Sequence, residues 1–224
     1  MTDARLHAAA ELIRSELHVD IGSDHAGLPV LLLRSGRVQR CIVVEKTPGP
    51  LETARQGLGS AGLLERCELR LGDGFGPLQP HELGSVSLTG LGARTMVRIL
   101  ERAPQPPGAL VLQPNDDPGL LRRWAAAHGY WLVAERLVAG FWRYPVLRLE
   151  PHAGPDPAYL GLPPNAALRF GPHLLREQHP LLLEELQAQQ QRLARLAAHG
   201  RAQVLQDLAD VEAALAWLAH PSQA

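Results

Sequence analysis

Acidic residues and glycines that directly follow an apolar run are the first candidates for chemistry in this chain. Residues 17–21 predict a buried strand; Asp20, Gly22 and Asp24 lie at its end, ahead of an apolar, helix-like segment over 28–33. Glycine lets the backbone approach a ligand, and a helix start has free N–H groups. A dinucleotide-binding G-x-G-x-x-G loop would need glycine at position 24. Aspartate there repels a pyrophosphate but favours a cationic sulfonium or ammonium, so the loop suits S-adenosylmethionine better than NAD.

Candidate ligand-binding residues also follow the next four predicted strands. They are Glu45 at the end of 40–45, Asp73 and Gly74 after 67–71, Gly90 and Leu91 after 83–88, and Asn115 after 109–112. In open α/β sheets, ligands bind at the carboxyl ends of the strands. Each acid taken alone is more often a cap or turn residue. Acids or acid–glycine pairs at the ends of consecutive strands together indicate a nucleotide-like cofactor site.

The chemistry of this cofactor suggests a role for each acid. Glu45 is placed to accept hydrogen bonds from both ribose hydroxyls. Asp73 is placed to accept one from the adenine amino group, with Gly74 giving access to the backbone. Asp20 or Asp24 would then hold the ammonium of the methionine part.

The elements that must position these residues alternate along the chain. Helical spacing or end signals predict helices over 4–17, 28–35, 48–62, 94–102 and 118–128, between the five strands. Alternation of this kind is typical of a parallel sheet covered by helices on both faces. Residues 130–138 and 141–149 then follow one another with only Ala139 and Gly140 between them, which predicts an antiparallel hairpin. The fold class is therefore an α/β class I methyltransferase (Rossmann-like) sheet, and a dinucleotide-binding sheet would continue with a parallel strand instead.

The C-terminal part has a different composition. Residues 151–164 are rich in proline and glycine and read as a linker. Beyond them, leucines and valines recur every three or four residues on both sides of His199 and Gly200, which predicts an antiparallel helical hairpin packed as a short coiled coil. Two amphipathic helices resting on the main domain are the alternative. We expect a methyltransferase domain over 1–150 and a linker with a helical domain over 151–224.

Composition limits the function classes. The chain has 224 residues, 46% hydrophobic and 20% charged, with a net charge of −1. Bulk charge gives no case for nucleic-acid binding, so any RNA contact must come from a local patch. No segment resembles a signal peptide or approaches the roughly 18 apolar residues of a membrane span. Cys41 and Cys67 lie in predicted strands, as buried thiols of a cytoplasmic protein do. We expect neither a metal site nor a membrane partner, and we interpret His25 as a turn or cap residue rather than a base.

Six segments together resemble the bacterial tRNA adenine-22 N1-methyltransferases in order and spacing over nearly the whole chain. They are DIGSDHAGLP, VVEKTPGPLETA, GDGF, TGLGA, ALVLQPN and FGPHLLREQHP. The resemblance implies a class I sheet that binds S-adenosyl-L-methionine, a C-terminal coiled-coil domain that helps to hold tRNA, and methyl transfer to N1 of adenine 22 in the D-arm. It also implies a cofactor site made of Asp20, Gly22, Asp24, Glu45, Asp73, Gly74, Gly90 and Leu91.

The sequence departs from the family pattern at two places. The family usually has tyrosine where Gly27 stands, so a large surface near the site is missing here. It also usually reads GMGG where this chain has Gly90-Leu91-Gly92-Ala93. Leucine conserves the volume of methionine, and a Cβ at Ala93 is tolerated if φ is negative there. The first departure bears on the target nucleotide more than on the cofactor.

A tRNA methyltransferase is our main hypothesis. N1 of neutral adenine has a free lone pair, so catalysis rests on positioning in a desolvated site, with the adenine unpaired or flipped. Asp24 and Asn115 are the candidates for orienting the adenine, Asp24 by accepting from its amino group. A methyltransferase for a small molecule or protein, and a catalytically silent cofactor- and RNA-binding module, are the alternatives. We expect a monomer or weak homodimer, with RNA contacts from Arg169, Arg176, Arg192 and Arg195.

Overall fold

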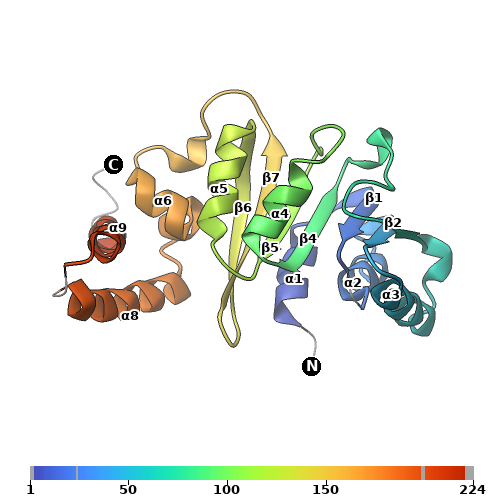
Figure 1. Ribbon diagram of the computed structural model, residues 1–224, viewed down its shortest axis with the longest axis horizontal. Helices are drawn as coiled ribbons and strands as arrows, with labels where there is room; N and C mark the ends of the chain where they lie inside the picture. Colours follow the sequence, from blue (N-terminus) through green and yellow to red (C-terminus); the bar gives the residue numbers. More distant parts are fainter. Residues whose placement is uncertain (1–2, 24, 198–199, 220–224) are drawn as a thin grey trace.

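A seven-stranded sheet forms the centre of the protein (Figure 1). The computed structural model describes residues 3–23, 25–197 and 200–219. The strand order is β3-β2-β1-β4-β5-β7-β6. The strands are β1 (Ser15–Ile21), β2 (Val38–Glu45), β3 (Cys67–Leu71), β4 (Val86–Leu91), β5 (Leu110–Pro114), β6 (Tyr130–Ala139) and β7 (Arg143–Pro151). The first five are parallel, and β7 is antiparallel to both β5 and β6. The predicted parallel sheet closed by a hairpin is confirmed.

Helices cover both faces of the sheet because alternate strand residues point to opposite faces. The helices around it are α1 (Ala4–Glu11), α2 (Gly27–Arg34), α3 (Pro48–Ser60), α4 (Ala93–Leu100) and α5 (Pro118–Ala127). Ile42 and Val44 of β2 belong to the core cluster under α4 and α5, whereas Cys41 and Val43 belong to the cluster under α1, α2 and α3. Short 3₁₀ turns are η1 (Leu64–Arg66), η2 (Pro80–Glu82) and η3 (Pro157–Tyr159).

Two predicted boundaries were wrong. The first helix ends at Glu11 and not at residue 17, because β1 starts at Ser15, which pairs with Val38 of β2. The fourth strand spans Val86–Leu91 rather than 83–88, and its pairing with β5 shifts register between Thr89 and Leu91. The intervening Gly90 has φ of +73°, a conformation that glycine adopts without steric cost. Gly90 and Leu91 therefore belong to the strand itself.

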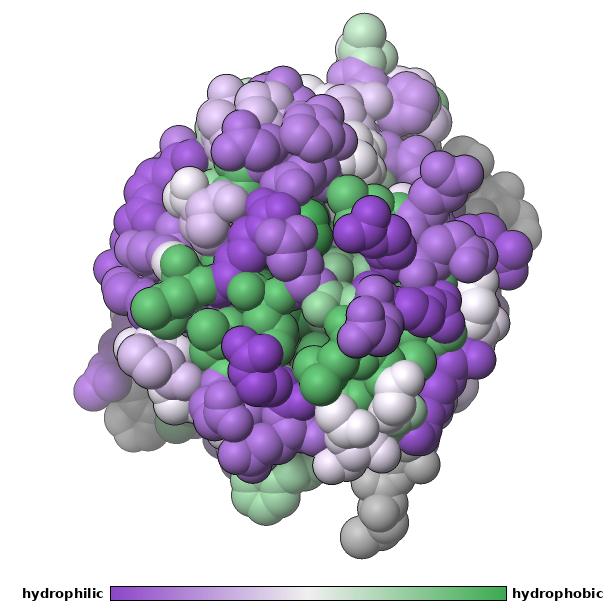
Figure 2. Space-filling view, turned by 90° about the vertical axis from the view of Figure 1, so that its right-hand side faces the viewer, coloured by the Kyte–Doolittle hydropathy of each residue, from purple (hydrophilic) through white to green (hydrophobic). Residues whose placement is uncertain are grey.

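The β3 edge of the molecule is partly apolar. Figure 2 shows hydrophobic side chains gathered in the middle of this side, with hydrophilic ones around them. Leu71, the last residue of the edge strand β3, is 53% exposed. None of the helices in the described ranges is long and apolar enough to cross a membrane.

The C-terminal part forms a third core cluster of its own. It contains α6 (Pro164–Phe170), α7 (Pro172–Arg176), α8 (Pro180–Ala197) and α9 (Ala202–Ala219). Leu182, Leu186 and Leu193 of α8 and Val211 of α9 are buried in it, so the predicted helices and most of their apolar positions are confirmed. Figure 1 shows α8 across the view and α9 almost end-on, so the helices cross steeply. This differs from the side-by-side packing of a coiled coil, because α9 also packs against α6.

A buried ion pair joins the C-terminal helices to the sheet. Arg122 of α5 and Glu135 of β6 are each 1% exposed at the side chain, and Nε of Arg122 donates to Oε1 of Glu135 at 2.7 Å. Nη1 of Arg122 also donates to the carbonyl oxygens of Leu168 and Arg169 at the end of α6, both at 2.9 Å. The guanidinium thus holds α5, β6 and α6 together.

Loss of this pair should therefore destabilise the whole chain. In Arg122→Ala, Glu135 becomes an uncompensated buried charge, so we expect the free energy of unfolding to fall by about 3–5 kcal/mol. Urea denaturation followed by circular dichroism measures it. The neighbouring Arg123, exposed and 3.5 Å from Asp117, is the matched control: Arg123→Ala should change stability by less than about 0.5 kcal/mol. Equal losses in the two variants would contradict this assignment.

Candidate functional site

A cavity of about 330 Å³ lies at the carboxyl ends of β1, β2, β3 and β4. Five of the predicted cofactor residues line it: Gly22, Glu45, Asp73, Gly74 and Leu91. They come from four different strand ends, which the parallel sheet brings to one edge. Its size falls within the roughly 300–1,000 Å³ typical of small-molecule sites.

Three other predicted cofactor residues stand differently. Asp20 does not line the cavity; it is buried one residue below Ile21, which does. Gly90 lies beside the lining residue Leu91 without lining the cavity itself. Asp24 lies outside the described residues, so its role stays a prediction from sequence.

Glycine is required at two positions of the cavity wall. Gly22 has φ of +77° and Gly74 has φ of +61°, values that are strained for other residues. A Cβ on Gly74 would also lie 3.2 Å from the side chain of Ile99. Both backbone turns therefore depend on glycine, which is a second reason for glycine beside the close approach of a ligand that the sequence suggested.

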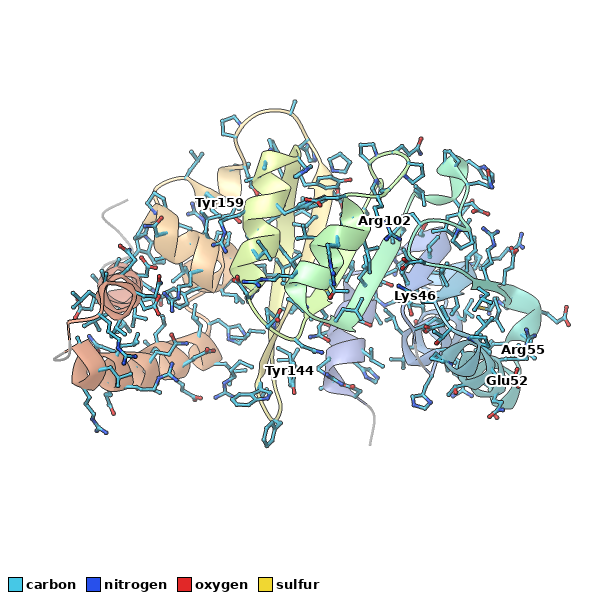
Figure 3. The ribbon with its side chains drawn as sticks, in the orientation of Figure 1. Lys46, Glu52, Arg55, Arg102, Tyr144 and Tyr159 are labelled. Atoms are coloured by element: carbon cyan, nitrogen blue, oxygen red, sulfur yellow. The ribbon has the colours of Figure 1, made fainter. Side chains whose placement is uncertain are left out.

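Two cations hold the carboxylate of Asp73. Oδ2 lies 2.9 Å from Nη2 of Arg102 and 3.4 Å from Nζ of Lys46. Both basic residues, labelled in Figure 3, line the cavity. The hydrogen bond from Arg102, and after it the one from Lys46, lowers the pKa of Asp73 below its ordinary value. A ligand amino group at Asp73 must therefore share the carboxylate with two exposed cations. Sequence reasoning missed Lys46 and Arg102, although Lys46 is the chain's single lysine and directly follows Glu45.

A chain of buried polar groups below the cavity ends at Asp20. Nδ1 of His18 lies 2.8 Å from Oγ of Ser85, and Nε2 of His18 lies 2.8 Å from Oγ of Ser87. Ser87 in turn donates to Oδ1 of Asp20 at 2.5 Å. Burial lowers the pKa of His18 to about 3, so its ring is neutral at pH 7.

Because the His18 ring is neutral, the donor and the acceptor of each hydrogen bond from Ser85 to Asp20 can be assigned. Ser87 has one hydroxyl proton and gives it to Asp20, so His18 must donate from Nε2 to Ser87. Nδ1 is then an acceptor and receives the proton of Ser85. The chain fixes Oδ1 of Asp20, whereas Oδ2 is buried with no hydrogen-bond partner among the described residues. Sequence reasoning missed His18 because it lies within an apolar run.

A second cavity, of about 260 Å³, is lined by Asn115 and its neighbours in the chain. It is bounded by residues after β5, by the β6–β7 hairpin and by α6 and α8, among them Asn115, Asp116, Arg122, Trp142, Arg143 and Phe170. Nδ2 of Asn115 donates to the carbonyl oxygen of Gly90 at 2.6 Å, which ties the loop after β5 to the end of β4. Asp116 accepts from the backbone N–H of Ala93 at 2.6 Å and caps α4. The loop that lines the second cavity is therefore tied to the strand end whose Leu91 lines the first.

The two departures from the family pattern have structural reasons. A Cβ on Gly27 would lie 2.8 Å from Cδ1 of Leu6, so α1 takes the space that a side chain at position 27 would need. Ala93 is the first residue of α4 and is fully buried. It does not have positive φ, so its Cβ causes no backbone strain.

The four predicted RNA-binding arginines divide into two pairs. Nη1 of Arg169 lies 2.5 Å from Asp207 and 3.3 Å from Asp210, so it joins α6 to α9. Arg176 donates to the carbonyl oxygens of Ala158 and Leu160. Arg192 and Arg195 are exposed on α8. An RNA contact stays a prediction for all four, and the second pair is the more accessible.

The thiols and the carboxylates form no metal centre in the described part of the chain, where no group of three or more His, Cys, Asp or Glu side chains could hold an ion. Cys41 is buried, Cys67 is half-buried, and both are free. They are register partners on β2 and β3, and burial raises the pKa of both thiols, that of Cys67 to about 12. Neither is a nucleophile at neutral pH.

Comparisons with known proteins agree with this geometry. A family model described as tRNA (adenine(22)-N(1))-methyltransferase matches residues 18–219. The tRNA (adenine(22)-N(1))-methyltransferase of Bacillus subtilis (strain 168) is 31% identical over 187 residues, 81% of this chain and 78% of that protein.

Solved structures show the same similarity. The crystal structure of the B. subtilis M1A22 tRNA methyltransferase TrmK has a TM-score of 0.81 at 26% identity, over 98% of this chain and 97% of that one. A Streptococcus pneumoniae protein solved in complex with S-adenosyl-L-methionine has a TM-score of 0.82 at 27% identity, over 96% of this chain and all of that one.

The buried chain of hydrogen bonds makes a testable contribution to stability. In Ser87→Ala, both His18 and Asp20 lose a partner without access to water, so we expect the free energy of unfolding to fall by about 1–3 kcal/mol. Ser60, exposed at the end of α3, gives the matched control Ser60→Ala, which should change it by less than about 0.5 kcal/mol. Thermal denaturation of both variants measures the difference. If Ser87→Ala loses no more stability than Ser60→Ala, the hydrogen bonds among His18, Ser87 and Asp20 do not stabilise the fold.

Proposed function

The chain belongs to the tRNA (adenine(22)-N(1))-methyltransferase family, and from this premise we propose how its two cavities divide the reaction. The cavity at Gly22 and Glu45 binds S-adenosyl-L-methionine. The cavity at Asn115 receives adenine 22 of tRNA, whose N1 takes the methyl group. The observation that carries this proposal is the hydrogen bond from Asn115, which lines the second cavity, to Gly90, the neighbour of Leu91 in the wall of the first.

The residues of the first cavity fit the proposed cofactor. Glu45 is at the end of β2, where its carboxylate would accept hydrogen bonds from the ribose hydroxyls. Gly74 gives the adenine close access to the backbone, and Asp73 would accept from the adenine amino group while Arg102 and Lys46 stay beside it. Asp20 does not line this cavity, but its buried carboxylate lies one residue below the lining residue Ile21 and would attract the ammonium from there.

Methyl transfer at N1 needs positioning rather than a strong base. The lone pair of N1 attacks in line, and the bound cofactor supplies a methyl group on a cationic sulfur. Nδ2 of Asn115 is already used on Gly90, so Oδ1 is the atom that would accept from the adenine amino group and aim N1. We propose the same acceptor role for Asp24 on the grounds of its place in the loop. Exclusion of water by the bound adenine would favour attack by a neutral base.

The C-terminal helices are the proposed tRNA-holding unit. Residues 151–224 follow the methyltransferase domain of residues 1–150, and their own core cluster supports this division. Arg192 and Arg195 lie exposed on α8, and Arg169 and Arg176 strengthen the unit from within. We propose that the protein acts in the cytoplasm as a monomer or weak homodimer, without a metal.

The decisive experiment is a methyl-transfer assay with labelled S-adenosyl-L-methionine and unmodified tRNA. We expect label in N1-methyladenosine at position 22, and none in tRNA with guanine at that position. Asn115→Ala and Asp24→Ala should each lower the rate about 100-fold, because the adenine is misplaced. Affinity for S-adenosylhomocysteine should be unchanged in Asn115→Ala, because Asn115 lines only the second cavity. Asn165→Ala, at an exposed position on α6, is the matched control and should keep the wild-type rate. Wild-type turnover in Asn115→Ala and Asp24→Ala would remove both residues from the mechanism.

Cofactor binding should weaken in mild acid. Burial raises the pKa of Asp20 to about 6. Above that pH the carboxylate is ionised and attracts the ammonium; below it the acid is neutral and the attraction is lost. We therefore expect the Kd of S-adenosylhomocysteine, measured by calorimetry between pH 8 and pH 5, to rise as pH falls through 6. Asp20→Asn should bind weakly with little change over this range, and a flat profile in the wild type would refute the role of Asp20.

A further inference from the structure

The two most exposed large hydrophobic side chains of the described chain lie next to each other. Phe141 is 89% exposed and Trp142 67% exposed, at the turn of the β6–β7 hairpin. Their ring centroids are 5.2 Å apart in an edge-to-face arrangement, with an interplanar angle of 86°. Exposed apolar surface that is contiguous, rather than scattered over single residues, is a mark of interaction sites.

The turn is supported from both sides. β6 and β7 pair as far as Ala139 and Arg143, so the turn contains only three residues. Nη2 of Arg143 lies 2.8 Å from Glu184 of α8. The guanidinium of Arg5, from α1, lies 4.8 Å above the ring of Tyr144, which Figure 3 shows near the lower end of the hairpin. The β7 end of the turn is therefore held by α1 and α8, and the rings are carried on a short turn rather than on a long loop.

Topology places the turn beside the proposed target site. β5 and β6 are both antiparallel to β7, so they run in the same direction, and the turn after β6 lies at the edge where β5 also ends. Trp142 and Arg143 line the same 260 Å³ cavity as Asn115. An indole at the mouth of this cavity can meet a base that enters it.

We infer that Trp142 stacks on adenine 22 of the tRNA when the base enters the Asn115 cavity, with Phe141 supporting the indole through its edge. The inference rests on the proposed function and adds a specificity-determining residue to it. N1 lies on the pairing edge, so the adenine must leave its stack before transfer, and an aromatic ring replaces the lost stacking. Stacking leaves the pairing edge free for Asn115.

The surroundings favour a base over a protein partner. The cavity wall carries charged side chains of both signs, including Asp116, Arg143 and Glu185, beside the indole. Two rings are far smaller than the roughly 1,200 Å² of a stable protein–protein interface. A single flat ligand with polar edges, as a purine is, fits this combination.

The test uses tRNA with 2-aminopurine at position 22, whose fluorescence falls on stacking. We expect quenching by the wild-type protein and by Trp142→Phe, but not by Trp142→Leu, which keeps apolar bulk without a ring. Trp142→Leu should also bind tRNA about tenfold more weakly, with affinity for S-adenosylhomocysteine and the salt dependence of tRNA binding unchanged. Trp131→Leu, at the opposite end of β6 where Trp131 stacks on His152, is the matched control and should bind tRNA as the wild type does.

The outcomes separate this inference from the proposed function. If the wild type methylates adenine 22 and Trp142→Leu quenches and binds equally well, stacking by Trp142 is overturned and the proposed function stands. If the wild type transfers no label to tRNA, the proposed function is wrong, and the inference that rests on it is wrong as well. A wild-type dimer in sedimentation that dissociates in Trp142→Leu would assign the rings to a second copy and overturn the inference.

Discussion

The buried ion pair between Arg122 and Glu135 is the constraint on which the arrangement of the two halves depends. Charges without access to water must be compensated by partners with good geometry, and here the partners come from α5, β6 and the end of α6. Gly171 has φ of +104°, and a Cβ there would lie 2.5 Å from Oε2 of Glu135. The residue that follows α6, at position 171, must therefore be glycine. Arg122 also lines the Asn115 cavity, so the contact that docks the C-terminal helices shapes the proposed target site.

The cofactor side depends on a buried carboxylate instead. Asp20 has no water to stabilise its charge, and the hydrogen bonds from Ser85 through His18 and Ser87 all run toward it. A neutral histidine in this chain orients the carboxylate without adding a positive charge that would compete with a cationic ligand. Asp73 shows the opposite solution. It is exposed, and its charge is balanced by Arg102 and Lys46 before any ligand arrives.

The sequence was sufficient to predict which strand ends meet, because parallel strands have their carboxyl ends at one edge. Glu45, Gly22 and Gly74 were found this way, and all three line the cavity. Pairings between distant segments were not predictable. Arg169 follows a proline-rich linker and looks available to phosphate, but its partners are acids 38 and 41 residues later on α9. The steep crossing of α8 and α9 was not predictable for the same reason. Heptad spacing shows which face of a helix is apolar, but not which other elements pack against that face.

The missing aromatic at position 27 and the exposed rings of the hairpin turn belong to one region. Leu6 of α1 takes the space beside Gly27, and Arg5 of the same helix lies over Tyr144 at the base of the turn. α1 thus packs against α2, which begins at Gly27. The same helix also packs against β6 and β7, the hairpin that carries Trp142. A large ring at position 27 would have to displace the side chain of Leu6. On the proposal that Trp142 stacks on the target adenine, the aromatic surface that position 27 lacks comes instead from the β6–β7 turn, whose Trp142 lines the Asn115 cavity.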